Sequence, residues 1–440
     1  MKEINRLFYD KLDKRIDKKS ILLLTGIRQS GKTTALKHLE KRIEGKKLWI
    51  NFDKFQERMR IQKNPGNLVS DIQEAAGKTL ENIKNERVFV FMDEVQKVPG
   101  VFDTVKWIHD DFGDVVKFIF SGSSTLNLYQ RASESLAGRT DIVNVFPFTF
   151  KEALHFASGK NLKPLTGIHY LGEKKLDEQE FDRWCQVSAP FKRTFEREWD
   201  RLILYGFLPG IFHIDTEKDK WEYLSNFRHT YIEKDIRDIP NIGNIMGFNK
   251  MLSILANRTS NLLDYSNMGN LLKLNRKTIA KYMNILLETF VVLELQPFFK
   301  NIEKRVVKTP KIYFLDTGIR NQISGSFSLE ILEDRGEMGK IAEQAILVEV
   351  MKLLHYSGYP FNIYFYRTHS GAEIDLVLEM PKGIVLMEIK RGKKAGDRAI
   401  RSFMDEWPGK NKTGFVLSLT EPPAIIGPGL YRITPWMLLT

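Results

Sequence analysis

Short apolar runs separated by longer amphipathic stretches organise the first third of the chain. The runs at 20–26, 47–53, 87–94 and 115–123 are rich in Ile, Leu, Val and Phe and have the length of buried strands. The stretches between them carry apolar residues at helical spacing. Strands that alternate with helices predict a parallel sheet covered on both faces, so we expect an α/β domain over residues 1–156.

The pattern changes twice in the rest of the chain. Residues 157–245 begin with a polar stretch and continue with helical periodicity, which predicts a helical lid or linker region. Residues 246–322 combine helices with two apolar strands around a basic turn, an arrangement typical of a winged-helix domain. Residues 323–440 begin with one helix and continue with three strands, the order αβββ.

Composition narrows the class of partner and the compartment. The net charge of +12 favours an anionic partner such as nucleic acid or an acidic membrane surface, although a merely soluble basic protein has the same charge. Cys185 is the only cysteine, so no disulfide framework is possible. The sequence lacks an apolar run of membrane-spanning length and an apolar signal segment, so we expect a cytoplasmic protein without a membrane partner.

The segment GIRQSGKT, residues 26–33, follows the first strand and has the G-x-x-x-x-G-K-S/T spacing of a phosphate-binding loop. Gly26 and Gly31 allow backbone N–H groups to point at phosphate oxygens, and the next helix adds its dipole. Lys32 is expected to reach the β- and γ-phosphates, and Thr33 to hold Mg²⁺. The expected nucleotide-binding residues are Gly26, Gln29, Ser30, Gly31, Lys32, Thr33, Thr34, Asp93 and Ser121.

Two acids at the end of the strand 87–94 complete a site for ATP hydrolysis. Asp93 is expected to bind the Mg²⁺ shell together with Thr33, and Glu94 to polarise the attacking water. Ser121 ends the next strand and is expected beside the γ-phosphate. The sequence therefore predicts an ATPase with ATP and Mg²⁺ as cofactors.

Five segments carry a resemblance to a known family: LTGIRQSGKTT, FMDEVQKVP, FIFSGSS, LAGRTDIVNVFPFTFKEAL and YIEKDI. They resemble the prokaryotic AAA-type P-loop ATPases that have a carboxy-terminal domain of unknown function, over nearly the whole chain. Ser121 stands where that pattern usually has threonine. The resemblance implies a homo-oligomer or ring in which a neighbour's arginine completes hydrolysis. Arg139 is the candidate for this role, and a salt bridge within its own loop is the alternative.

The winged-helix region carries a basic helix start. Asn275 is expected to cap its second helix, and the turn of the following hairpin is basic. Basic side chains at the start of a recognition helix suit phosphate and base-edge contacts, so duplex or branched DNA is the expected partner. Winged helices inside ATPases also serve as packing modules, which is the alternative. The expected DNA-binding residues are Arg276, Lys277, Thr278, Lys281, Lys304 and Arg305, and Lys311 is assigned to the same basic wing.

Charged residues interrupt two apolar strands in the stretch 372–392. Buried charges are costly without a partner or a metal ion. A hairpin turn places Asp375 near Glu388, and Glu388 shares a strand face with Lys390. With Glu343 on the preceding helix, the acids predict a Mg²⁺ site with Asp375 and Glu388 as ligands, and Lys390 is expected to orient or deprotonate the attacking water. The D-x12-E-x-K spacing and the αβββ order are similar to the PD-(D/E)xK nuclease core, which implies a restriction-endonuclease-like fold.

Three functions remain open from the sequence. The first is an ATP-driven DNA-processing enzyme whose carboxy-terminal domain cleaves DNA with Mg²⁺. The second is a nucleotide-dependent switch that binds DNA or protein and retains the nuclease fold only as an inactive platform. The third is a signalling ATPase that contacts only protein, for which no salt-dependent DNA affinity is expected.

Overall fold

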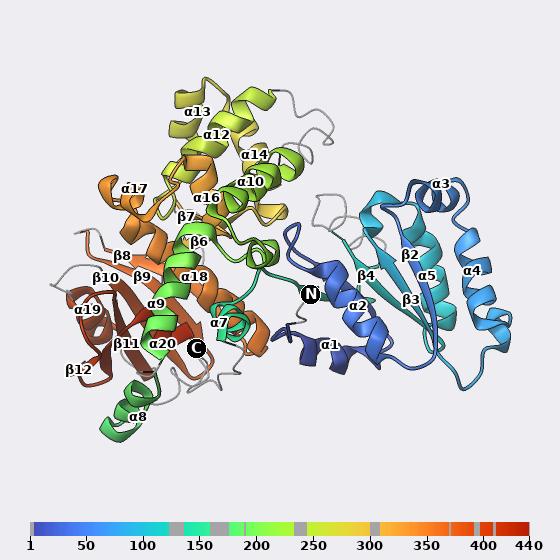
Figure 1. The fold of residues 1–440 in the computed structure, drawn as a ribbon, viewed down its shortest axis with the longest axis horizontal. Coiled ribbons are helices and arrows are strands. Elements are labelled where there is room, and N and C mark those ends of the chain that lie inside the picture. Colours follow the sequence, from blue (N-terminus) through green and yellow to red (C-terminus); the bar gives the residue numbers. More distant parts are fainter. Residues whose placement is uncertain are drawn as a thin grey trace. The chain divides into compact units, whose positions relative to one another are not determined.

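The chain forms two compact units (Figure 1). The computed structural model describes residues 4–122, 136–158, 176–188, 191–232, 244–299, 309–368, 371–390, 397–407 and 411–439. The smaller unit contains residues 5–147 and 284–290, and the larger unit contains 1–4, 148–283 and 291–440.

A parallel sheet lies at the centre of the smaller unit. Its strands are β1 (Ile21–Thr25), β2 (Lys46–Asn51), β3 (Val88–Asp93), β4 (Val116–Ser121) and β5 (Thr140–Asn144). They lie in the order β2-β3-β4-β1-β5, and every neighbouring pair is parallel. The helices are α1 (Tyr9–Ile16), α2 (Lys32–Arg42), α3 (Phe55–Lys63), α4 (Asn67–Ala76) and α5 (Val101–Phe112). The parallel α/β domain predicted from the sequence is confirmed.

The sheet is buried on both faces, which explains why the sequences of its strands are continuous apolar runs. Every residue of β1, β3 and β4 is buried. On one face Leu23 and Val90 join a core with Ile72 of α4 and Val105 of α5, while α2 covers the other face (Figure 1). Because the strands are parallel, their carboxyl ends meet at one edge of the sheet, and polar loops there come close together.

The larger unit contains a mixed sheet. Its strands are β6 (Val292–Pro297), β7 (Lys311–Phe314), β8 (Asn362–Arg367), β9 (Glu373–Met380), β10 (Gly383–Lys390), β11 (Asn411–Ser418), β12 (Ala424–Gly427) and β13 (Leu430–Ile433). Their order is β12-β13-β11-β10-β9-β8-β6-β7, with β8, β9 and β10 antiparallel and β10 parallel to β11. Helix α18 (Met338–Ser357) precedes β8, so the predicted succession of one helix and three strands is present.

The hairpin expected for the wing belongs to this same sheet. Strand β6 pairs antiparallel with β7, and it also pairs parallel with β8 through Gln296 and Tyr364. The second pairing satisfies backbone N–H and C=O groups that would be unpaired at a free edge of β6. The boundary expected between residues 322 and 323 therefore does not separate two sheets.

The larger unit also contains the following helices, one of which ends among residues 284–290 of the smaller unit. They are α7 (Phe150–Ser158), α8 (Glu178–Ser188), α9 (Lys192–Tyr205), α10 (Glu217–Phe227), α12 (Ile245–Asn257), α13 (Tyr265–Leu272), α14 (Arg276–Glu288), α16 (Thr317–Ser324), α17 (Leu329–Asp334), α18, α19 (Arg398–Glu406) and α20 (Pro435–Leu439). Helix α19 packs on Ile384 and Leu386 of β10 through Ile400 and Phe403. Among the residues that the structure describes, no helix is both long and apolar enough to cross a membrane.

The region expected to be a helical lid or linker is helical in its described parts. Helix α9 packs against α7, α16 and α18, all within the larger unit. Asn321 of α16 donates its side-chain amide to the carbonyl oxygen of Ile203 at 2.8 Å, and Asp316 accepts the N–H of Phe207 at 2.8 Å. These buried hydrogen bonds give the region a shared core with α16, and its role as a lid stays a prediction.

Candidate functional sites

The phosphate-binding loop lies where β1 ends and the chain turns into α2. Gly26 and Gly31 have φ angles of 146° and 102°, which side chains disfavour. A Cβ atom at Gly26 would lie 2.2 Å from the carbonyl oxygen of Val145, so this glycine is required by contact as well as by conformation. The loop therefore packs directly against the residue that follows β5.

The side chain of Lys32 extends back over this loop. Its ammonium donates to the carbonyl oxygens of Gly26 at 3.1 Å and Ile27 at 3.0 Å, and the residue is 5% exposed. Ser30 is buried, whereas Gln29 and Thr34 are exposed. The lysine of the motif thus lies inside the loop that is expected to surround phosphate oxygens.

Three elements bring Thr33, Asp93 and Ser121 together. The hydroxyl of Thr33 on α2 lies 3.2 and 3.0 Å from the two carboxylate oxygens of Asp93, at the end of β3. The hydroxyl of Ser121, at the end of β4, donates to the same carboxylate, and Asp93 is 2% exposed. Hydroxyl and carboxylate oxygens are the ligands that Mg²⁺ prefers. The residues present at this edge of the sheet therefore fit a magnesium nucleotide.

Glu94 follows Asp93 in an uncommon backbone conformation. Its φ of 57° and ψ of 43° are left-handed, a region where residues other than glycine are rare and often functional. Its N–H donates to Ser121 Oγ at 3.4 Å, and Gln96 donates to its Oε2 at 2.6 Å. Gln96 was not predicted from the sequence, because a glutamine two residues after an acid is a common pattern.

Arg6 also supports the loop and was missed. Its buried guanidinium donates to the carbonyl oxygens of Ser30 at 3.1 Å and Phe146 at 2.7 Å. It thereby ties the phosphate loop to the segment that leaves β5. Both partners are distant in sequence, and a single arginine in a charged amino-terminal segment gives no signal of this contact.

Arg139 lies near the amino-terminal ends of the strands, opposite the ends that carry the phosphate loop. Its backbone oxygen accepts the N–H of Ile21 at 2.8 Å where β1 starts, whereas the phosphate loop follows the end of β1. Its guanidinium donates two hydrogen bonds to the Asp110 carboxylate, from Nε at 2.6 Å and from Nη2 at 2.9 Å. This hydrogen bonding lowers the pKa of Asp110 to about 2. A salt bridge is therefore present, but its acid belongs to α5 and not to the loop of Arg139, and action on a neighbouring subunit stays a prediction.

The four residues expected at the nuclease-like site are gathered at one end of β9 and β10. The pairing of these strands runs to Leu376 and Met387, so Asp375 and Glu388 lie directly beyond the last pair. Lys390 Nζ is 2.6 Å from Glu388 Oε1. Burial raises the pKa of Glu343 on α18 to about 7, and the nearby charge of Asp375 adds to the rise.

Lys311 of β7 lies among these acids, which the sequence did not indicate. Its Nζ is 2.8 Å from Glu343 Oε1 and 3.9 Å from Asp375 Oδ1, and it also pairs with Glu373. Tyr313 donates to Glu343 Oε1 at 2.6 Å. Burial alone would lower the pKa of Lys311, but the three carboxylates raise it to about 12. Its assignment to a solvent-facing basic wing was wrong, because the side chain is 3% exposed and faces acids.

The arrangement does not fit the Mg²⁺ ion expected at Asp375 and Glu388. The described residues contain no group of three or more His, Cys, Asp and Glu side chains placed to hold a metal ion. Asp375 Oδ2 accepts the N–H of Ile389 at 2.8 Å, and its other oxygen faces Lys311. Glu388 Oε2 is buried without a hydrogen-bond partner in the described structure. Of the four carboxylate oxygens of the two expected ligands, three thus face an N–H group or a lysine, so the pair does not offer the two open carboxylates on which the predicted Mg²⁺ site depends.

The start of α14 is the expected DNA-contacting surface. The side chain of Asn275 accepts the N–H of Thr278 at 2.7 Å, which confirms the predicted cap. Arg276 and Lys277 are exposed, and neither forms an ion pair with a described residue; Lys281 is half-buried. Lys304 and Arg305 of the expected wing lie outside the described residues.

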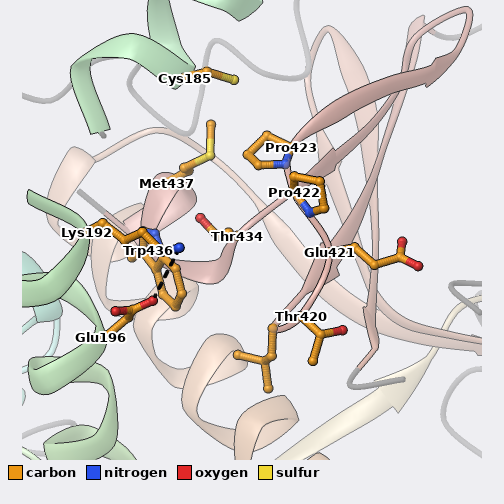
Figure 2. Close-up of a pocket in the computed structure, with 11 residues that line it drawn as sticks. Cys185, Lys192, Glu196, Thr420, Glu421, Pro422, Pro423, Thr434, Trp436 and Met437 are labelled. Carbon is orange, nitrogen blue, oxygen red and sulfur yellow. Dashed lines mark ion pairs between the residues drawn. The ribbon is translucent and has the colours of Figure 1, made fainter. Parts of the chain in front are cut away.

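A pocket of about 490 Å³ lies beyond the carboxyl end of β11 (Figure 2). Its lining includes Trp436 and Met437, and Figure 2 shows Pro422 and Pro423 opposite them. Two of its charged residues pair with each other, Lys192 and Glu196 at 3.8 Å, and Glu421 pairs with Arg432. These charges are already compensated, so the described lining of the pocket adds no uncompensated charge to the sites above.

Comparisons with known proteins find relatives that cover most of this chain. An uncharacterized protein of Mycobacterium tuberculosis is 26% identical over 382 residues, which cover 87% of this chain and 72% of the relative. An uncharacterized protein of Methanocaldococcus jannaschii is 25% identical over 416 residues, covering 91% and 83%. Among solved structures, a Walker-type ATPase of Pyrococcus abyssi covers 72% of this chain and 94% of its own, with 14% identity and a TM-score of 0.43.

Three protein families match successive parts of the sequence. Residues 196–330 match a domain of unknown function, DUF8612, and residues 338–426 match another, DUF4143. The first of these crosses the boundary expected between residues 245 and 246. Residues 18–154 match the AAA domain. With the parallel sheet and the phosphate loop, this match identifies residues 18–154 as a P-loop ATPase domain of the AAA type.

Proposed function

We propose that this protein is an ATP-hydrolysing switch or motor that acts on DNA. The observation that carries the ATPase half is the convergence of Thr33, Asp93 and Ser121 beside a loop that encloses the ammonium of Lys32. Nucleotide phosphates would be held by the loop N–H groups and Lys32, and Thr33 and Asp93 would hold Mg²⁺, whose charge offsets that of the phosphates. Glu94, oriented by Gln96, positions the attacking water.

Self-association is supported by the position of Arg139. The residue lies at the opposite end of the strands from its own phosphate loop, so any role in hydrolysis would be at a neighbouring subunit's site. An arginine supplied by a partner stabilises the charge that develops during phosphoryl transfer. This supports a homo-oligomer or ring.

Glu94→Gln tests the hydrolytic role directly. We expect ATP turnover, measured as phosphate release, to fall on the order of 10²-fold, because the amide cannot accept a proton from water. ATP binding should be unchanged, so light scattering of the ATP-bound variant would report the assembled state. The control is Glu57→Gln, a half-exposed acid of α3. Unchanged turnover in Glu94→Gln would remove Glu94 from the mechanism.

DNA binding is the second half of the proposal. It is supported by Arg276 and Lys277, two exposed cations at the capped start of a helix whose first turn holds no acid. Such a helix start meets phosphates without having to break ion pairs. Cleavage by Glu343, Asp375, Glu388 and Lys390 is the competing function of the larger unit, and a signalling ATPase that contacts only protein is the third.

The salt dependence of binding distinguishes these functions. We expect duplex and branched DNA to bind with an affinity that falls steeply with salt, and Arg276→Ala and Lys277→Ala each to lower the slope of log K against log salt by about 1. Fluorescence anisotropy measures both quantities. Lys218→Ala, which alters an exposed lysine of α10, is the matched control. A parent protein without salt-dependent affinity would favour the protein-directed ATPase.

A further inference from the structure

The acids at the centre of the larger unit are paired with the protein's own cations. Lys311 contacts Glu343, Glu373 and Asp375. Two other cations each contact one acid: Arg367 lies 3.8 Å from Glu373, and Lys390 pairs with Glu388. We propose that the ammonium of Lys311 takes the place of a divalent cation at this centre, so that the nuclease-like site is metal-free and does not cleave DNA.

The position of Lys311 is fixed by backbone pairing on both sides of its strand. It is opposite Leu295 in the β6–β7 hairpin, and it forms a bridge with Leu262. Its side chain is buried, so the ammonium cannot move into solvent without disturbing the hairpin. A divalent cation in contact with the same carboxylates would be repelled by this charge at short distance. Lysine and metal ion are therefore alternatives at this centre.

The same sequence pattern is compatible with a metal-binding centre and with a metal-free one. Asp375, Glu388 and Lys390 have the spacing of a nuclease core, but catalysis also depends on which cation lies beside Asp375 and Glu343. Here that position is filled by a residue 64 positions before Asp375, from a different strand pair. The inference rests on the proposed function only in taking DNA as the substrate to test.

The first measurement is Mn²⁺ binding in the absence of nucleotide. Binding is monitored as a decrease in the EPR signal of free Mn²⁺. We expect the full-length parent and Asp375→Asn to bind Mn²⁺ equally, because any ion at Thr33 and Asp93 is common to both. Lys311→Ala should gain one Mn²⁺ site per chain, and the double variant Lys311→Ala/Asp375→Asn should lose it. Lys311→Arg, which keeps the charge, should gain none, and neither should Lys412→Ala, whose lysine on β11 donates to the Met404 carbonyl oxygen.

The second measurement is cleavage of linear, single-stranded and branched DNA with Mg²⁺ or Mn²⁺. We expect the parent to cut no more than Asp375→Asn. Cleavage that requires Asp375, a Mn²⁺ site in the parent that Asp375→Asn removes, or a folded Lys311→Ala without a new site would each overturn the proposal. If Lys311→Ala does not fold, the comparison of the parent with Asp375→Asn decides. ATP turnover, measured in parallel, reports separately on the proposed function.

Discussion

Replacing Lys32 with alanine is expected to lower ATP turnover on the order of 10³-fold. The ammonium lies 3.1 and 3.0 Å from two carbonyl oxygens of the loop that surrounds it, so it is already held where phosphate oxygens are to bind. Its loss removes the cation that offsets charge on the transferred group, in a site largely closed to water. Phosphate release under saturating ATP and Mg²⁺ measures the effect.

The control for this substitution is Lys37→Ala on the same helix. Lys37 is exposed, so the variant removes an equal charge from α2 without touching the loop. We expect Lys37→Ala to keep parental turnover and Lys32→Ala to keep its fold by circular dichroism. Turnover of the folded Lys32→Ala within a few fold of the parent would show that hydrolysis does not occur at this loop.

The nucleotide site could be predicted because its signals are local. Residues 26–33 carry both glycines and the lysine in one contiguous motif, and the strand before them and the helix after them are readable from periodicity. Asp93 and Ser121 were found because parallel strands end at a common edge. Each prediction needed only the identity of an element and the direction in which it runs.

The site residues that were not predicted are those whose contacts depend on pairing between segments far apart in the sequence. Arg6 contacts a residue 140 positions away, and Lys311 contacts Glu343 only because β7 joins the sheet that α18 crosses. The parallel pairing of β6 with β8 has no sequence signal, since either edge of a hairpin can accept a further strand. The nuclease-like spacing of the acids could therefore be predicted from the sequence, but the presence of Lys311 among them could not.

A buried ion pair ties the start of α7 to α18 in the larger unit. Lys352 Nζ lies 2.6 Å from Glu349 Oε1 and donates to the carbonyl oxygen of Phe148 at 2.9 Å. Glu349 Oε2 accepts the N–H of Phe150 at 2.6 Å, and both charged side chains are almost fully buried. Among the described residues, the two charges thus compensate each other and bind the backbone of Phe148 and Phe150, and the charge of Lys352 also acts on the Asp316 carboxylate.

Lys352→Met is expected to lower the local free energy of unfolding of α18 by about 3–5 kcal/mol, because it leaves Glu349 buried without its cation. Hydrogen exchange of the α18 amides, followed by mass spectrometry, measures this loss. The half-exposed Lys340 on the same helix gives the control Lys340→Met. The double variant Lys352→Met/Glu349→Gln should recover part of the loss, since the neutral amide removes the unpaired charge.

The pH dependence of this variant identifies the cause. Burial already raises the pKa of Glu349, and Lys352 opposes that rise, so removing Lys352 should raise it further. A carboxyl with a higher pKa in the folded state takes up a proton on folding, so stability falls as pH rises. The deficit of Lys352→Met should therefore shrink as pH falls from about 8 to about 5. A deficit that is constant over this range would indicate lost packing rather than an uncompensated charge.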